Sequence, residues 1–225
     1  MATDTEAGSN PHRTPGAGDA TAGRTASATE YASESARSIA DPAPLGLSAF
    51  ALTTFLLSLV NAKLIPAGAE PVVFGLALAY GGLGQFLAGM WEFRKGNTFG
   101  ATAFGSFGAF WISYWALVTF YLTSIPKADT NDAVGWFLIA WGIFTTIMFL
   151  ASFRTSAALV LLFLLLAATF YFLGFGNLNV SETTVKIGGY LGIVTAAVAW
   201  YAALAGVMAS TFGRTVLPNP PLAQR

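Results

Sequence analysis

The apolar residues of this chain are gathered into six long runs, and its polar residues lie in the links between them. A helix needs about 20 mostly apolar residues to cross a bilayer, and the runs do not alternate as the ~10-residue strands of a membrane barrel do. Short links between long helices favour antiparallel neighbours. The pattern therefore predicts an all-α integral membrane protein with six transmembrane helices, at residues 45–62, 72–91, 99–124, 133–152, 156–175 and 187–211.

Composition supports this class and excludes several others. The chain is 55% hydrophobic and 10% charged, whereas soluble domains carry about 25% charged residues. Its formal net charge of +0 argues against a nucleic-acid partner. With no cysteine and one histidine, His12, the usual metal sites and histidine-based catalysis cannot be built. We therefore expect no enzyme, no cofactor and no metal, and a lipid bilayer as the surroundings.

The distribution of charge along the chain predicts its domains and orientation. Residues 1–40 are polar, lack the apolar core of a signal peptide and are predicted to be a disordered cytoplasmic tail. Residues 41–218 form the transmembrane domain, and 219–225 a short C-terminal tail. Lysine and arginine favour the cytoplasmic side, so the chain is predicted to be a multi-pass protein of the cell (inner or plasma) membrane with both termini in the cytoplasm. The inside then holds Arg37, Arg94, Lys95, Arg154 and Arg214, and the outside holds Lys63, Lys127 and Lys186.

Polar residues at the helix ends are candidate caps. Asp41 precedes Pro42, and proline is tolerated in the first turn of a helix because its missing N–H has no partner there. Asp41 is therefore expected to cap the first span, and Asn97 and Asp132 to cap the third and fourth. Glu92 is expected to form an ion pair at the membrane interface with the neighbouring basic residues.

The predicted spans hold almost no charge but many neutral polar groups. Without a buried charged relay, a passive pore or proton movement on the substrate is favoured over a titrating pump. Single hydroxyls in membrane helices mostly bond to their own helix, so each serine or threonine either lines the pathway or only packs. The amides of Asn61 and Gln85 are costly to bury without a partner, so they either line the pathway or bond one helix to another. The candidates for a substrate pathway are Thr53, Thr54, Asn61, Tyr80, Gln85, Ser106, Thr145 and Thr146, with Asp41 and Pro42 at its mouth. Small residues repeat every four positions in several spans, which allows close packing within one subunit or between subunits.

Four stretches resemble one known family. They are DPAPLGL at 41–47, YGGLGQ at 80–85, EFRKGNTFG at 92–100 and FGRTVLP at 212–218. Together they are similar to the GPR1/FUN34/YaaH family of acetate transporters, also called succinate–acetate permeases. The likeness extends over about residues 41–218, with six helices in both.

The resemblance implies a six-helix subunit around a pore, assembled as a homo-hexamer, that moves acetate and in some members succinate. It implies an apolar constriction at Phe50, Phe107 and Leu166. This chain departs from the family at two of the matched positions, since Phe107 is commonly tyrosine and Asp41 is usually asparagine.

The predicted function is transport of acetate and related short carboxylates, as an anion channel or by symport with a proton. Hydroxyl and amide donors would replace part of the hydration shell, and the aromatic constriction would act as the gate. One alternative is a channel for ammonium or neutral solutes. An aquaporin-like channel needs two Asn-Pro pairs within its membrane-spanning part, and the Asn-Pro pairs of this chain, Asn10-Pro11 and Asn219-Pro220, both lie in its tails. The other alternative is a membrane sensor or scaffold that transports nothing.

Overall fold

The computed structural model describes residues 39–220 and residue 222. The chain divides into two units, Met1–Ala40 and Asp41–Arg225. All but the last two residues of the predicted disordered tail lie outside the described part, so that prediction stays untested. The second unit contains every helix described below.

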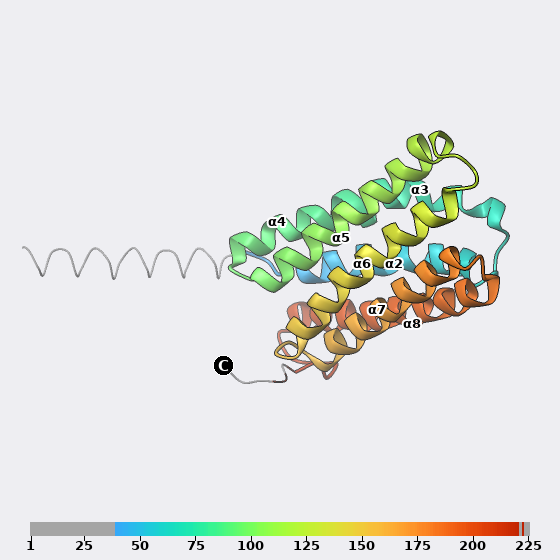
Figure 1. The fold of residues 1–225 in the computed structure, drawn as a ribbon. Helices are drawn as coiled ribbons and strands as arrows, with labels where there is room; N and C mark the ends of the chain where they lie inside the picture. Colours follow the sequence, from blue (N-terminus) through green and yellow to red (C-terminus); the bar gives the residue numbers. More distant parts are fainter. Residues whose placement is uncertain (1–38, 221, 223–225) are drawn as a thin grey trace, which may run out of the picture. The chain divides into compact units, whose positions relative to one another are not determined.

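The second unit is a bundle of six membrane-length helical spans (Figure 1). Single helices form the first and the last three spans, while the second and third spans are each made of several helical segments. The elements are α2 (Ala43–Asn61), η1 (Ala67–Ala69), α3 (Pro71–Leu78), η2 (Ala79–Gly84), α4 (Gln85–Lys95), α5 (Thr98–Ala116), η3 (Leu117–Tyr121), η4 (Leu122–Ser124), α6 (Thr130–Ser152), α7 (Ala157–Leu178) and α8 (Glu182–Phe212). The predicted six-helix fold is confirmed.

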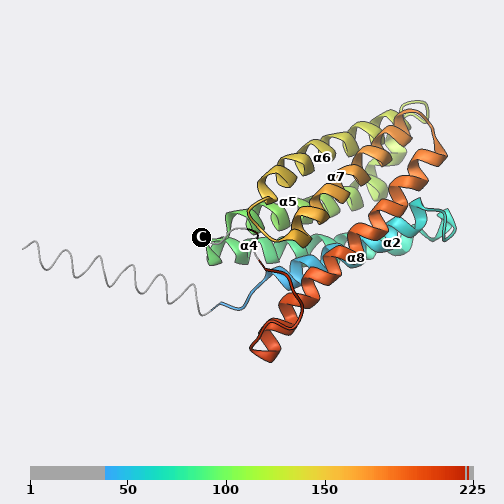
Figure 2. The same cartoon turned by 90° about the horizontal axis from the view of Figure 1, so that it is seen from below.

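Successive spans are antiparallel, so that the links alternate between the two ends of the bundle (Figure 1). We call the end where α2 begins and α8 finishes the proximal end. It holds the α4–α5 and α6–α7 links. The distal end holds the links after α2, after η4 and after α7. The helix α8 lies along α2 and α7 in Figure 2, while α6 packs on α7 and α4 on α5.

The helix caps match the sequence in two of three places. The Asp41 carboxylate accepts the Ala43 N–H at 3.0 Å, and the Asn97 side chain accepts the Gly100 N–H at 3.2 Å. The prediction for Asp132 is wrong, because α6 begins at Thr130 with Asp129 as its flanking residue. The low hydropathy of residues 130–132 indicates where the helix would leave the bilayer, but a helix can continue through polar residues beyond that point.

Glycine residues allow the backbones of α4 and α5 to come into direct contact. A Cβ added to Gly108 would lie 2.5 Å from the Phe86 amide nitrogen, and one added to Gly89 would lie 2.5 Å from the Gly105 amide nitrogen. Membrane helices associate through such close packing, because lipid tails are as apolar as the side chains that face them. The hairpin of α4 and α5 is therefore a rigid wall of the bundle.

Candidate transport passage

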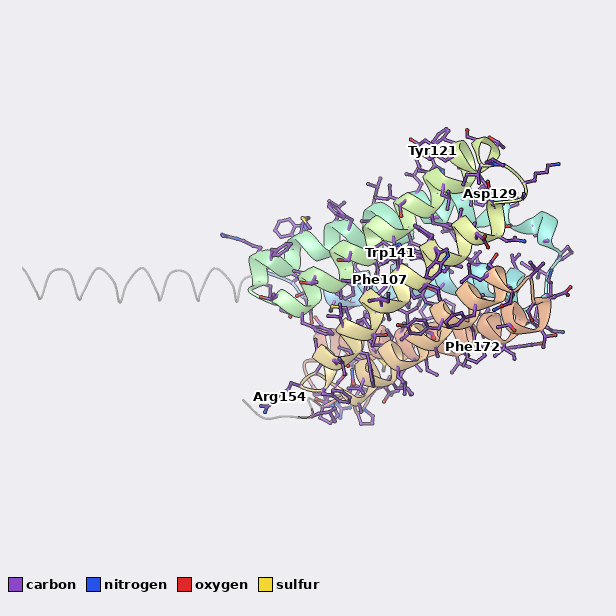
Figure 3. All side chains as sticks on the ribbon, in the orientation of Figure 1. Phe107, Tyr121, Asp129, Trp141, Arg154 and Phe172 are labelled. Atoms are coloured by element: carbon purple, nitrogen blue, oxygen red, sulfur yellow. The ribbon has the colours of Figure 1, made fainter. Side chains whose placement is uncertain are left out.

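Aromatic rings fill the middle of the bundle around Phe107. Its ring lies 5.5 Å from Phe144, 6.1 Å from Phe50 and 6.2 Å from Phe163, measured between ring centroids. Figure 3 shows Phe107 and Trp141 close together at mid-length, and their centroids are 6.1 Å apart. These rings come from α2, α5, α6 and α7, so the centre of the bundle is an apolar cluster.

Two cavities lie on either side of this cluster. The proximal cavity has a volume of about 70 Å³, and the distal cavity about 270 Å³. Phe50 and Leu166 line both cavities and are buried, so these two side chains form the wall between them. Phe107 is also buried and lines the proximal cavity. The role of these three residues as a constriction stays a prediction.

The proximal cavity is mostly apolar but contains two buried polar side chains. Gln85 is 1% exposed and Glu92 is 0% exposed. Both line the cavity, and one side-chain oxygen of each has no hydrogen-bond partner in the described part of the chain. The six-residue π-helical segment Ala79–Gly84 comes directly before Gln85, and such irregular turns are frequent at functional sites.

The expected ion pair of Glu92 at the membrane interface is wrong. Its other carboxylate oxygen accepts a hydrogen bond from the Asn97 amide at 2.8 Å, and the carboxyl group lies inside the bundle. Lys95 instead pairs with Asp41 at 2.8 Å, which joins the start of α2 to the end of α4. The Asp41 carboxylate is thereby held by a cation.

The distal cavity contains two buried hydrogen-bond donors without a partner. The Thr54 hydroxyl and the Trp111 indole N–H have no partner among the described residues, and the two side chains are 5% and 2% exposed. They come from α2 and α5 and line the same cavity. Carboxylate oxygens only accept hydrogen bonds, so such donors are suited to a carboxylate.

Other polar groups surround these donors. Ser58, Asn61, Thr169 and Asn177 line the same cavity. Glu70 also lines it and accepts a hydrogen bond from the Tyr114 hydroxyl at 2.5 Å. The distal cavity thus combines several neutral polar groups with one carboxylate.

The structure brings only some of the sequence-predicted pathway residues to these cavities. Thr54 and Asn61 line the distal cavity, and Gln85 lines the proximal one. The remaining candidates do not line either cavity, and they are Asp41, Pro42, Thr53, Tyr80, Ser106, Thr145 and Thr146. The Thr145 and Thr146 hydroxyls donate to carbonyls one turn earlier, and Thr146 also bonds to the Tyr171 hydroxyl at 3.0 Å.

Six polar residues of the distal cavity were not among the predicted pathway residues, and they are Ser58, Glu70, Trp111, Tyr114, Thr169 and Asn177. Trp111 and Tyr114 were part of an aromatic-rich span in which most rings pack, and Asn177 fell beyond the predicted end of its helix. Glu70 fell in a link and was not linked to the pathway. Three-residue spacing on one helix places Trp111 and Tyr114 on one face of α5, and that spacing was the available signal.

No metal site is apparent in the described part of the chain. No group of three or more histidine, cysteine, aspartate or glutamate side chains lies close enough there to hold an ion. The residues that line the two cavities offer hydrogen-bonding groups and apolar walls.

Six membrane-length helices around two cavities, separated by apolar side chains, define a multi-pass membrane protein with an internal passage. The sequence pattern of the GPR1/FUN34/yaaH family matches residues 23–224, and the chain belongs to that family. The family is one of transporters, and the chain is not an enzyme.

Named relatives and one solved structure agree with this assignment. The chain is 43% identical to "Acetate permease A" of Emericella nidulans, over 84% of this chain and 68% of that protein. It is 36% identical to "Succinate-acetate/proton symporter SatP" of Escherichia coli, over 80% of this chain and 95% of that protein. Its fold is similar to a structure described as the bacterial acetate channel SatP. The TM-score is 0.76 and the identity 36%, and the match covers 81% of this chain and 99% of that one.

Proposed function

We propose that this protein carries acetate and related short carboxylates, including succinate, across a membrane as a channel or in symport with a proton. The family and its named relatives support this function. A free carboxylate cannot cross hydrocarbon unaided, because burying an ion without partners is very costly. A protein that moves it must supply donors along the way.

One observation carries the proposal. The distal cavity places the unpartnered donors of Thr54 and Trp111 next to the apolar wall of Phe50 and Leu166. A carboxylate can accept hydrogen bonds from these donors while its short alkyl group contacts the apolar wall. Weak binding of the carboxylate at these donors suits conduction, because the solute has to leave the site again.

The gate is assigned to Phe50, Phe107 and Leu166. An apolar constriction excludes hydrated ions and admits a small solute when side chains move aside. Because Phe107 carries no hydroxyl, the three gate side chains offer the passing solute no hydrogen bond. The solute therefore has to pass these three side chains on apolar contacts with them.

Orientation and assembly belong to the same proposal. The basic residues Arg94, Lys95, Arg154 and Arg214 lie at or beyond the proximal helix ends, and Figure 3 shows Arg154 there. The excess of positive charge supports a cytoplasmic location for the proximal end and for both termini. A homo-hexamer is proposed on the family resemblance and on the small-residue faces of the helices.

Flux into liposomes tests the function. Carboxyl groups of this kind titrate near pH 4, so at pH 8 acetate is almost entirely the anion and leaks slowly through bare lipid. We expect vesicles that contain the protein to take up labelled acetate at least tenfold faster than empty vesicles, and unlabelled propionate to compete.

Two outcomes would contradict the proposal. Equal uptake by protein-containing and empty vesicles would exclude a carboxylate passage. Glycerol-driven swelling or methylammonium flux without acetate flux would favour the alternative of a channel for ammonium or neutral solutes.

A further inference from the structure

We propose that Glu70 makes the distal cavity a charge filter, which admits carboxylates with one charge and rejects those with two. This inference rests on the proposed transport function and names the substrate class that the distal cavity selects. None of the proximal residues is needed for it.

The geometry holds the Glu70 carboxylate at the cavity. Glu70 lies between η1 and α3, where it precedes Pro71. The Tyr114 hydroxyl on α5 donates to Oε1 at 2.5 Å. Hydrogen bonds to a carboxylate are short and strong, so this bond ties the link to the helix wall. Both side chains line the cavity.

The bound substrate and Glu70 have to share a small volume. Trp111 lies one turn before Tyr114 on α5, and their ring centroids are 5.9 Å apart. A substrate carboxylate that accepts from Trp111 and Thr54 therefore lies in the same 270 Å³ space as Glu70. The methyl group of acetate adds no further charge there. The second carboxylate of a dicarboxylate does so when it is ionised, so the succinate of the proposed function passes in its singly charged form.

The lining of the cavity offers no positive charge to offset two carboxylates. Neither lysine nor arginine is among the described residues that line it. The distal lysines Lys63, Lys127 and Lys186 are exposed. Like charges repel strongly where low-dielectric walls replace water, so a dianion is disfavoured and a monoanion much less so.

The experiment compares two substrates with the same four-carbon chain that differ in one charge. Labelled succinate and its monomethyl ester are each transported into liposomes at pH 8 by the full chain. We expect the wild type to favour the ester by at least tenfold. Glu70→Gln keeps the shape and an acceptor for Tyr114 but removes the charge, and it should reduce this preference at least fivefold.

Two further variants separate charge from packing. Glu70→Asp retains the charge and should retain the preference for the ester. Asp129→Asn removes an exposed carboxylate at the same end of the bundle that does not line the cavity, and it should behave as the wild type (Figure 3). Circular dichroism and thermal unfolding in detergent report that each variant is folded.

Three results would overturn the inference. They are an unchanged preference in Glu70→Gln, an equal loss in Glu70→Asp, or an equal loss in Asp129→Asn. If the wild type transports acetate and fails one of these tests, only the filter is wrong. If the wild type transports no carboxylate, the proposed function fails and the filter falls with it.

Discussion

At the scale of single residues, two neighbouring threonines have opposite environments. The Thr53 hydroxyl donates to the Ala49 carbonyl at 2.9 Å, within its own helix. The Thr54 hydroxyl has no partner and lines the distal cavity. A helix turns by about 100° per residue, so adjacent positions face different neighbours. Only Thr54 has a donor that is free to bind a substrate.

Thr54→Val tests this difference. Valine has nearly the same shape but no hydroxyl, and a hydrogen bond to a charged group is worth about 1.5–3 kcal/mol. We expect acetate flux to fall by about tenfold or more. Thermal unfolding should be unchanged or slightly more difficult, because an unpartnered buried hydroxyl is removed. Flux is measured in liposomes and unfolding in detergent.

Thr53→Val is the matched control. It removes a hydroxyl of the same type from the same helix, so its flux should stay within twofold of the wild type. Equal losses of flux in both variants would show that the hydroxyls act through packing of α2.

Residue-level prediction from the sequence was only partly successful. The sequence showed that Thr54, Asn61 and Gln85 were polar groups inside the spans, but it could not show which way each one faced. Glu92 was placed at the membrane interface because it lies near the end of a span beside basic residues. The hydrogen bond from the Asn97 amide, five positions later, instead holds the Glu92 carboxylate inside the bundle. The local pattern of charge does not show that this side chain points inward.

At the scale of elements, the α4–α5 hairpin depends on glycines that differ in their surroundings. A Cβ on Gly108 would meet the backbone of Phe86, whereas a Cβ on Gly105 would meet only the end of the Met90 side chain, at 3.6 Å. Backbone cannot move aside without separating the helices, and a flexible side chain can.

Gly108→Ala is therefore expected to destabilise the bundle. Overpacking typically costs about 1–3 kcal/mol, which corresponds to a drop in melting temperature of about 2–12 °C for a chain of this size. Gly105→Ala should leave the melting temperature unchanged or raise it slightly, since alanine is a better helix former than glycine. Similar melting temperatures for the two variants would contradict the close backbone contact.

The elements themselves were well predicted from the sequence, because the need for about 20 apolar residues leaves little freedom. The helix ends were predicted less accurately. The last helix begins at Glu182, five residues before its apolar run, where the Ser181 hydroxyl accepts the Thr184 N–H at 3.3 Å. The breaks in the second and third spans, at η2 and η3, leave no hydropathy signal.

At the scale of the whole molecule, Phe50 and Leu166 keep the two cavities apart. This arrangement brings together residues that are more than 100 positions apart in the sequence. The periodicity of the sequence does not predict that these two side chains lie together. That prediction came only from the resemblance to a known family. The distal donor Trp111 and the acid Glu70 were missed for the same reason.

Leu166→Ala is expected to join the two cavities and widen the passage. The uptake of butyrate relative to acetate should rise at least fivefold, because a longer alkyl chain then fits. Leu162→Ala is the matched control. Leu162 is equally buried on the same helix but lines only the proximal cavity.

Both leucine variants lose a similar core contact, which typically costs about 2–5 kcal/mol. Their melting temperatures should therefore fall alike, while only Leu166→Ala alters the ratio of butyrate to acetate uptake. An unchanged ratio in Leu166→Ala would show that the wall between the cavities lies elsewhere.

The walls of the bundle differ in what holds them closed. The helices α4 and α5 are in contact through their backbones. The helices α5 and α6 have few close contacts, and aromatic side chains fill the space between them, with Phe107 packed on Phe144 and Phe110 on Phe137. Turning these rings breaks no hydrogen bond. The passage can therefore widen more easily between α5 and α6 than between α4 and α5, so a bulky solute is expected to separate α5 from α6.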